Sequence, residues 1–204
     1  LYDFFVNGAV NEDVFAYSNR RGDDRALVVF HNRFAATSGW IRSSCAKVAN
    51  PETGDTAPVQ TDLGTALGFN DDGRHYYAFR DHAAGLEYLR NGRELCREGL
   101  FVSLEPYEFH VFLDFREIRD DDFGTWGHLC HRLSGGGAPS IDEVVKLVRH
   151  GTLVARFVDL WDEPAVLDIL ASPGSVTAAR RKVTAAFREK LVAFLTELAQ
   201  IGRA

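Results

Sequence analysis

Residues 14–30 read VFAYSNRRGDDRALVVF, and this stretch decides the class of fold. Apolar and aromatic residues form a short run at each end, and a polar segment around Gly22 separates the two runs. Aromatic and β-branched residues favour strands, and a polar turn between two such runs is typical of a β-hairpin. The stretch therefore predicts two antiparallel strands, over residues 14–18 and 26–30.

Similar short runs continue to about residue 118. They predict further strands over residues 40–48, 75–79, 85–89, 100–104 and 107–115, and a short helix over 63–69. In the last strand, period-two spacing predicts one shared face for Tyr107, Phe109, Val111, Leu113 and Phe115. Many short strands with frequent turns are typical of a sandwich of two sheets. We therefore predict an antiparallel β-sandwich of Greek-key type over residues 1–120.

After residue 120 the apolar residues recur every three or four positions, which is the helical period. This spacing predicts helices over residues 140–149, 152–161, 164–172 and 175–201. Ser140 and Glu143 have the spacing of a capping box at the start of the first. The sequence thus predicts an α+β protein in which a small helical bundle, residues 121–204, follows the sandwich.

The predicted C-terminal helix carries a single apolar stripe. The stripe consists of Val183, Phe187, Leu191, Phe194, Leu198 and Ile201. Such a stripe is expected to pack against the earlier helices of the bundle, because a helix of this kind gains its stability from burial. A homodimer formed through the C-terminal helix is the alternative.

The 204-residue chain has a net charge of −6, and all of this excess falls in residues 1–120. An acidic chain lacks the basic surface that displaces counterions from nucleic acid, so we expect no nucleic-acid partner. No apolar stretch approaches the roughly 20 residues of a membrane span, so no membrane partner is expected either. Three cysteines favour reduced thiols and a cytoplasmic rather than a secreted location. The absence of Met suggests a piece of a longer polypeptide.

No complete catalytic, metal or cofactor site is evident in the sequence. His128, Cys130 and His131 lie close together, but a zinc site needs a fourth ligand at suitable spacing. Residues 135–137 are all Gly, yet they lack the Lys of a phosphate-binding loop. Residues 80–82, Arg-Asp-His, could pair a base with an acid, but no nucleophile accompanies them. We therefore predict no catalytic residue, no metal and no cofactor.

Aromatic side chains are the strongest candidates for ligand binding. An exposed aromatic ring can stack on the apolar face of a sugar, whereas a buried ring fills the core. Trp40, Tyr76 and Trp126 are the candidate carbohydrate-binding residues. Burial in the core remains the alternative for each of them.

Several of these segments resemble the C-terminal β domain of the α-amylase family, glycoside hydrolase family 13. The resemblance rests on residues 11–20 (NEDVFAYSNR), 25–32 (RALVVFHN), 85–95 (GLEYLRNGREL) and 99–112 (GLFVSLEPYEFHVF). It covers roughly residues 10–118, while residues 121–204 match no family pattern.

The resemblance implies a domain-C-like β domain, which is a non-catalytic C-terminal part of an α-amylase-like glycoside hydrolase. The implied partners are the chain's own N-terminal catalytic barrel, which these residues do not include, and an α-glucan. The family's catalytic motifs do not occur here, and a (β/α)8 barrel usually takes about 250 residues. A carbohydrate-binding module that uses exposed aromatics is the alternative function.

Overall fold

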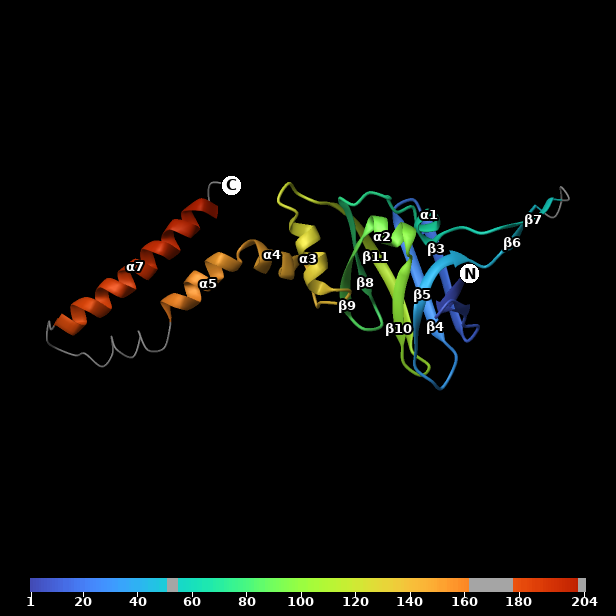
Figure 1. Ribbon diagram of the computed structural model, residues 1–204, viewed down its shortest axis with the longest axis horizontal. Coiled ribbons are helices and arrows are strands. Elements are labelled where there is room, and N and C mark those ends of the chain that lie inside the picture. The colour runs from blue at the N-terminus through green and yellow to red at the C-terminus, as the bar shows by residue number, and fades with distance from the viewer. Residues whose placement is uncertain (51–54, 162–177, 202–204) are drawn as a thin grey trace. The chain divides into compact units, whose positions relative to one another are not determined.

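The structure, a computed structural model, describes residues 1–50, 55–161 and 178–201. The chain divides into two compact units, Leu1–Val144 and Val145–Ala204. Figure 1 shows that the first unit contains the strands and that the second is helical. Residues 121–144, which the sequence places with the helices, thus group with the strands.

The strand-rich unit is built on one antiparallel sheet of nine strands. The strands are β1 (Tyr2–Val6), β2 (Ala9–Val10), β3 (Val14–Arg21), β4 (Asp24–His31), β5 (Thr37–Ser44), β8 (His75–Asp81), β9 (Leu86–Asn91), β10 (Leu100–Leu104) and β11 (Phe109–Arg119). Their order is β10-β5-β1-β3-β4-β11-β8-β9, with β2 paired to β1. A separate two-stranded ribbon contains β6 (Lys47–Asn50) and β7 (Asp55–Val59).

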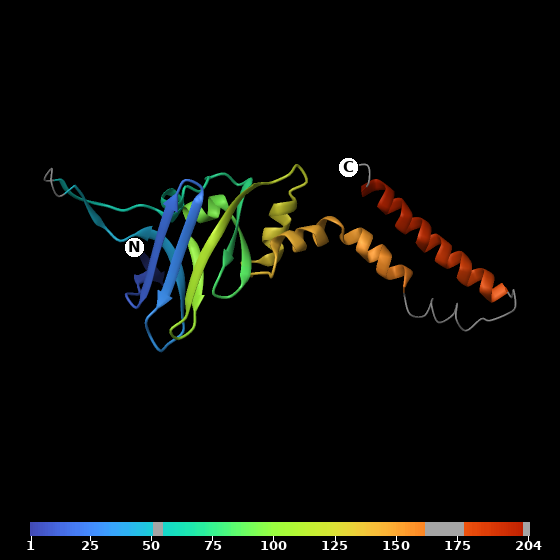
Figure 2. The same cartoon turned by 180° about the vertical axis from the view of Figure 1, so that it is seen from behind.

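The α+β class and the antiparallel pairing agree with the prediction from sequence. The expected sandwich is not confirmed. Backbone hydrogen bonds join each strand to the next through eight strands, which form one curled sheet rather than two separate sheets. Figure 1 shows the side of the sheet that carries β5 and β10, and Figure 2 shows the side that carries β3, β4 and β11. The two edge strands are β9 and β10.

The predicted hairpin is confirmed and is longer than expected. Strands β3 and β4 pair continuously from Val14 with His31 to Arg21 with Asp24. Gly22 in the two-residue loop has a φ of +63°, a conformation that glycine adopts without a steric cost. Along β3, Val14 and Ala16 are buried while Phe15 and Tyr17 are exposed, as the period-two pattern requires.

The core fills the inside of the curl. Its fully buried members include Phe4, Leu27, Val29, Ile41 and Leu104. Two short helices, α1 (Leu63–Leu67) and α2 (Gly92–Arg97), pack against each other beside this core and bury Leu63, Leu67 and Leu95.

In the first half of β11 the predicted alternation is present, and the apolar set that shares a face is the more exposed one. Phe109 is 52% exposed, whereas His110 and Phe112 are buried. The pairing register with β8 then shifts between Leu113 and Arg116. A bulge of this kind places an extra residue in one strand and changes which side chains face the core. Phe115, beyond the shift, packs against the core again.

Four helices follow the sheet in the described residues. They are α3 (Thr125–Leu133), α4 (Ile141–Arg149), α5 (Gly151–Leu160) and α7 (Ala178–Ile201). The backbone N–H of Glu143 donates to Ser140 Oγ at 3.3 Å, which confirms the predicted cap at the start of α4. The helix predicted over residues 164–172 lies outside the described residues.

In the helical unit, α5 packs against α7. The ring of Phe157 lies 5.8 Å from that of Phe194, and Lys190 Nζ lies 3.4 Å from the Asp159 carboxylate. On α7, Leu191 is half-buried and Leu198 is 44% exposed. The described helices therefore leave part of the apolar stripe uncovered. Within the ranges that the structure describes, no helix combines the length and apolar character that a membrane crossing requires.

Candidate functional site

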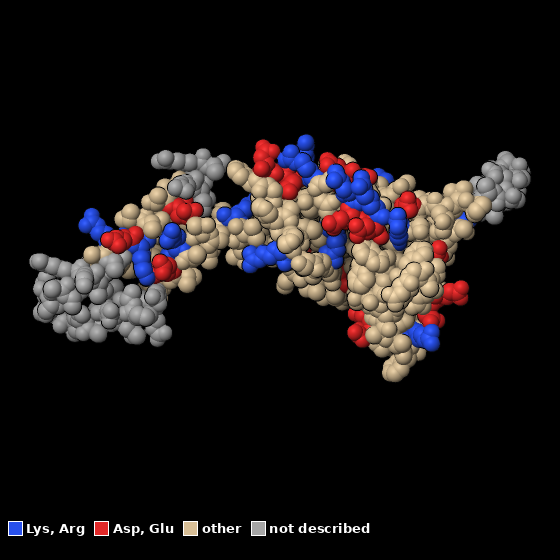
Figure 3. Space-filling view, in the orientation of Figure 1, with Lys and Arg blue, Asp and Glu red and all other residues tan. Residues whose placement is uncertain are grey.

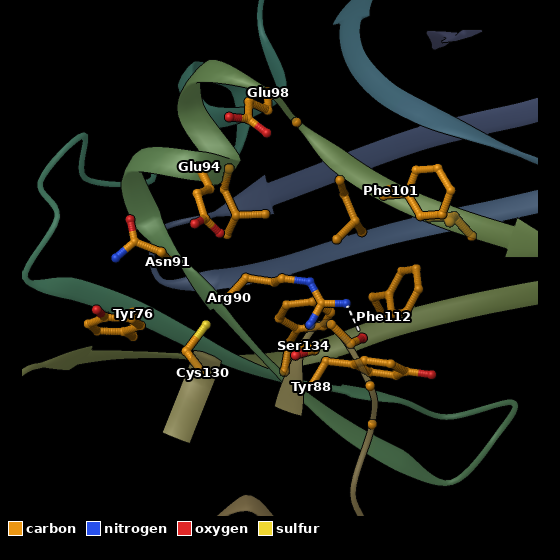
Figure 4. Close-up of a pocket in the computed structure, with 18 of the residues that line it drawn as sticks. Tyr76, Tyr88, Arg90, Asn91, Glu94, Glu98, Phe101, Phe112, Cys130 and Ser134 are labelled. Carbon is orange, nitrogen blue, oxygen red and sulfur yellow. Dashed lines mark hydrogen bonds between the residues drawn. The ribbon is translucent and has the colours of Figure 1, made fainter. Parts of the chain in front are cut away.

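A pocket of about 940 Å³ opens between the two edge strands of the sheet, β9 and β10. Helix α2 lines one end of it, and α3 and the Gly135–Gly137 segment line one side (Figure 4). We call this the seam pocket, and its lining includes Trp40, Tyr76, Tyr88, Arg90, Glu94, Glu98, Phe101, His110, Phe112 and Cys130. Small-molecule sites typically occupy about 300–1,000 Å³, so a ligand of several rings fits this volume.

Aromatic rings form both the floor and the rim of the seam pocket. On the floor, Phe79 stacks with Tyr88 at 5.9 Å and meets Phe112 edge-on at 5.5 Å between ring centroids. At the rim, Trp40 and Phe101 meet edge-on at 5.2 Å and are 38% and 46% exposed. The rim rings therefore offer apolar surface to a ligand, whereas the floor rings mainly complete the core.

Arg90 lies in the middle of the seam pocket, with Glu94 on one side and Tyr88 on the other (Figure 4). Its guanidinium donates to the carbonyl oxygens of Leu89 at 3.0 Å and Gly135 at 2.6 Å and lies 5.4 Å from the centre of the Tyr88 ring. Burial lowers the pKa of Arg90. No carboxylate forms an ion pair with it in the described part of the chain. Because a guanidinium carries five N–H donors, Arg90 keeps donors for a ligand.

Two exposed carboxylates lie at the α2 end of the pocket. Asn91 starts this helix, and its side chain accepts a hydrogen bond from Arg93 N at 3.0 Å. The helix then places Glu94 and Glu98 four residues apart on the pocket rim. Neither carboxylate accepts a hydrogen bond or forms an ion pair with a residue in the described ranges. Both are therefore available as acceptors for a ligand.

His110 and Asp81 form a buried pair at the pocket floor. Asp81 is fully buried, and its Oδ2 lies 2.6 Å from His110 Nδ1. Its Oδ1 accepts from Ala83 N at 3.0 Å and Val111 N at 3.2 Å. His110 Nε2 lies 3.1 Å from the carbonyl oxygen of Ser103 in β10. Since both carboxylate oxygens and both ring nitrogens are occupied, the pair fixes the positions of β8, β10 and β11 and offers no free group for proton transfer.

The Arg80-Asp81-His82 segment does not form one site. His82 Nε2 lies 2.7 Å from Asp114 Oδ2, and both side chains are well exposed, while Asp81 points to His110. His82 lies just beyond the end of β8, and the two side chains bind different partners.

The His128, Cys130 and His131 cluster gathers no further ligand. Among the described residues, no group of three metal-ligating side chains comes together. Cys130 Sγ lies 3.6 Å from the Leu89 carbonyl oxygen, and burial raises the pKa of this thiol.

The structure brings together two of the three predicted carbohydrate-binding residues. Trp40 and Tyr76 both line the seam pocket, but Tyr76 is only 8% exposed and offers little surface for stacking. Trp126 lies on α3, where its backbone N–H donates to Asp120 Oδ1 at 2.9 Å, and its side chain does not line the pocket. Sequence reasoning missed Arg90 as the central polar group. The sequence signal that could have indicated Arg90 is Asn91. Asn91 caps α2, so the residue before it lies at the junction between strand and helix.

A second surface lies on the outer side of β3, β4 and β11, which Figure 2 shows side by side. Cross-strand pairing aligns Phe15, Phe30 and Phe109 in one row and Tyr17, Val28 and Val111 in the next. We call these six residues the outer aromatic face. Phe15, Tyr17 and Phe109 are 46%, 49% and 52% exposed. A monomer rarely exposes such a continuous apolar patch unless it contacts a partner.

The pocket side of the sheet is different. Figure 3 shows Lys, Arg, Asp and Glu side chains gathered over α2, and a largely uncharged area over β5 and β10. The rim aromatics Trp40 and Phe101 belong to these two strands. The strand-rich unit therefore carries two distinct candidate surfaces, an apolar sheet face and a mixed aromatic and charged pocket.

Comparison with known proteins provides no relative from which a role could be transferred. No family model, curated protein or solved structure matches this chain. The roles of the residues described above therefore follow from geometry and chemistry alone.

Proposed function

We propose that this chain is a non-catalytic part of an α-amylase-like glycoside hydrolase. In this proposal the strand-rich unit is a domain-C-like β domain, and the outer aromatic face packs against the catalytic barrel and supports it. The segments that resemble the family supply β3, β4, β9, β10 and β11, which include the strands of this face.

The exposure of the outer aromatic face is the observation that carries this proposal. Burying an aromatic side chain stabilises a complex by about 1.5–3 kcal/mol when the whole side chain leaves water. Phe15, Tyr17 and Phe109 each keep about half of their surface exposed, so a covering domain would gain a substantial part of that energy at three adjacent positions.

The state of the acidic residues at and next to the seam pocket supports a non-catalytic role. Asp81 is fully buried and occupied by three hydrogen bonds. Glu94 and Glu98 are solvated at a pocket rim. A glycosidase acid is expected to be partly buried, because burial holds a proton on it near neutral pH. We therefore expect no hydrolysis of starch or of a nitrophenyl glucoside by this chain alone.

Two measurements test the proposal. The coding sequence upstream of Leu1 should contain the acidic catalytic motifs of the α-amylase family. The barrel that it encodes, produced separately, should bind this chain, and Tyr17→Asp or Phe109→Asp should abolish that binding. Phe123→Asp is the matched control, because Phe123 is 87% exposed and lies outside the face. An upstream sequence of another class, or binding that the control weakens equally, would refute the proposal.

A further inference from the structure

The edge of β10 that faces the seam pocket has backbone groups without partners. Strand β10 ends the sheet and pairs only with β5, so every second residue turns its N–H and C=O groups away from β5. Its residues from Leu100 to Ser103 line the pocket. In the described part of the chain, no backbone group bonds to β10 on this side. Such a free edge can hydrogen-bond to an extended segment that lies beside it.

The opposite wall of the pocket, formed by β9, offers a charge instead. The Leu89 carbonyl oxygen already accepts from Arg90 at 3.0 Å and lies 3.6 Å from Cys130 Sγ. The half-buried guanidinium of Arg90 extends into the pocket, and no carboxylate of the described residues pairs with it (Figure 4). A guanidinium binds a carboxylate through two parallel hydrogen bonds, and these are stronger than bonds between neutral groups. The pocket therefore offers backbone partners on one wall and a partner for a carboxylate on the other.

Helix α2 determines which part of an extended chain can reach Arg90. The helix connects β9 to β10 and lines one end of the pocket, and Arg90 immediately precedes its cap, Asn91. A chain lying along β10 meets α2 near Arg90 and cannot continue in a straight line there. A peptide that ends at this point presents its terminal carboxylate to the guanidinium.

We propose that the seam pocket binds the C-terminal end of a partner polypeptide, which adds to β10 as a strand and places its terminal carboxylate on Arg90. The five residues of β10 match an extended segment about 17 Å long. Side chains that point inward should be apolar, because they meet Tyr88 and Phe112. The exposed carboxylates of Glu94 and Glu98 favour a basic residue near the end of the peptide. None of these residues belongs to the outer aromatic face, so the site is separate from the proposed contact with a barrel.

Fluorescence anisotropy on the 204-residue chain tests this proposal. The first probe is the dye-labelled hexapeptide Thr-Val-Lys-Val-Thr-Val with a free C-terminal carboxylate, and the second is its C-terminal amide. The acid should bind with a Kd of about 0.1 mM or tighter, and the amide at least about tenfold more weakly because it lacks the charge. Replacing the Lys of the probe by Glu should weaken binding about two- to fivefold.

Two N-methylated forms of the acid peptide test the strand pairing. Each carries methyl groups on one set of alternate backbone nitrogens, which removes the N–H donors from one edge of the peptide. Because a strand pairs with β10 through one edge, one of the two forms should lose binding at least about tenfold.

Arg90→Gln assigns the terminal carboxylate to the pocket. This variant should bind the acid and the amide equally weakly, and circular dichroism checks that it is folded. Arg97→Gln is the matched control, because the Arg97 side chain lies on α2, is 63% exposed and does not line the pocket. The control should keep the preference of the parent chain for the acid.

Four results would overturn the proposal, and three of them need only the parent chain. The first is that the acid peptide does not bind, and the second is that the acid and the amide bind equally. The third is that both N-methylated forms bind as tightly as the unmodified peptide, or that N-acetylvaline alone does so, which would make the pocket a site for small carboxylates. The fourth is that Arg97→Gln removes the preference for the acid as fully as Arg90→Gln does. None of these results bears on the interaction of the outer aromatic face with a barrel.

Discussion

Replacing Asp81 by Ala should be one of the most destabilising single changes in the strand-rich unit. The carboxylate is completely buried and accepts three hydrogen bonds, from His110 at 2.6 Å, Ala83 N at 3.0 Å and Val111 N at 3.2 Å. The variant leaves two backbone donors and an imidazole without their acceptor in the interior. Removing one partner of a buried pair typically costs about 3–5 kcal/mol.

A loss of this size is a large part of the stability of an ordinary domain, which is about 5–15 kcal/mol. We therefore expect the urea midpoint of Asp81→Ala to fall well below that of the parent, with an unchanged slope. The double variant Asp81→Ala/His110→Ala should cost less than the sum of the two single variants, because the second change removes a group that the first has already left unpaired.

His82→Ala is the matched control, because it breaks an exposed pair at the residue that follows Asp81. His82 Nε2 lies 2.7 Å from Asp114 Oδ2, as close as the buried pair, but the side chains are 45% and 66% exposed. Breaking an exposed pair costs about 1 kcal/mol or less. If Asp81→Ala and His82→Ala lower the free energy of unfolding equally, burial is not what makes the Asp81 pair important, and the reasoning fails.

Further predictions concern other parts of the chain. Burial raises the pKa of Tyr77 from 10.0 to about 12, so its contribution to stability is complete below pH 10.0 and is lost as the pH rises toward 12. The free energy of unfolding should fall over this range, and the fall should be smaller in Tyr77→Phe; an identical fall would contradict the assignment. Because burial raises the pKa of Cys130, iodoacetamide should alkylate this thiol more slowly in the folded chain than in urea, and equal rates would count against it. A Cβ at Gly64 would lie 2.7 Å from Cys96 Sγ, so Gly64→Ala should lower the free energy of unfolding by about 1–3 kcal/mol, and an unchanged urea midpoint would disprove the tight contact. If α7 packs within its own chain, sedimentation should show that Leu191→Asp is a monomer, and its helical unit should have lost its structure. If instead the parent is a folded dimer and Leu191→Asp is a folded monomer, α7 is an assembly surface.

Local signals in the sequence predicted much of the fold. The β3–β4 hairpin followed from two apolar runs around Gly22, and the start of α4 followed from Ser140 and Glu143. Both depend on residues close in sequence. Strand β1 was missed although Asn7-Gly8, a strong hairpin signal, joins it to β2, where both residues have positive φ.

The errors arose where distant contacts decide the structure. The buried face of β11 depends on a register shift against β8, which the alternation of its own residues does not reveal. The sequence did not predict α2, because Asn91-Gly92 is a pair typical of a tight turn. In the structure Asn91 caps this helix, which packs beside the core. Trp40 of β5, Arg90 of β9 and Cys130 of α3 all line the seam pocket. Because these residues are far apart in the sequence, no local pattern could have predicted the pocket.

The two edges of the curled sheet have a consequence for aggregation. An unpaired edge strand can add a strand from another molecule and start edge-to-edge assembly. On β9, Glu87 exchanges two backbone hydrogen bonds with Ala138, of 2.7 and 2.8 Å, so the chain occupies part of that edge itself. The Gly135–Gly137 segment connects α3 to the residues before α4. It also allows Ala138 to reach β9 and to block the addition of a foreign strand there. Shortening this segment would free the edge, and the chain would then be prone to form strand-paired oligomers.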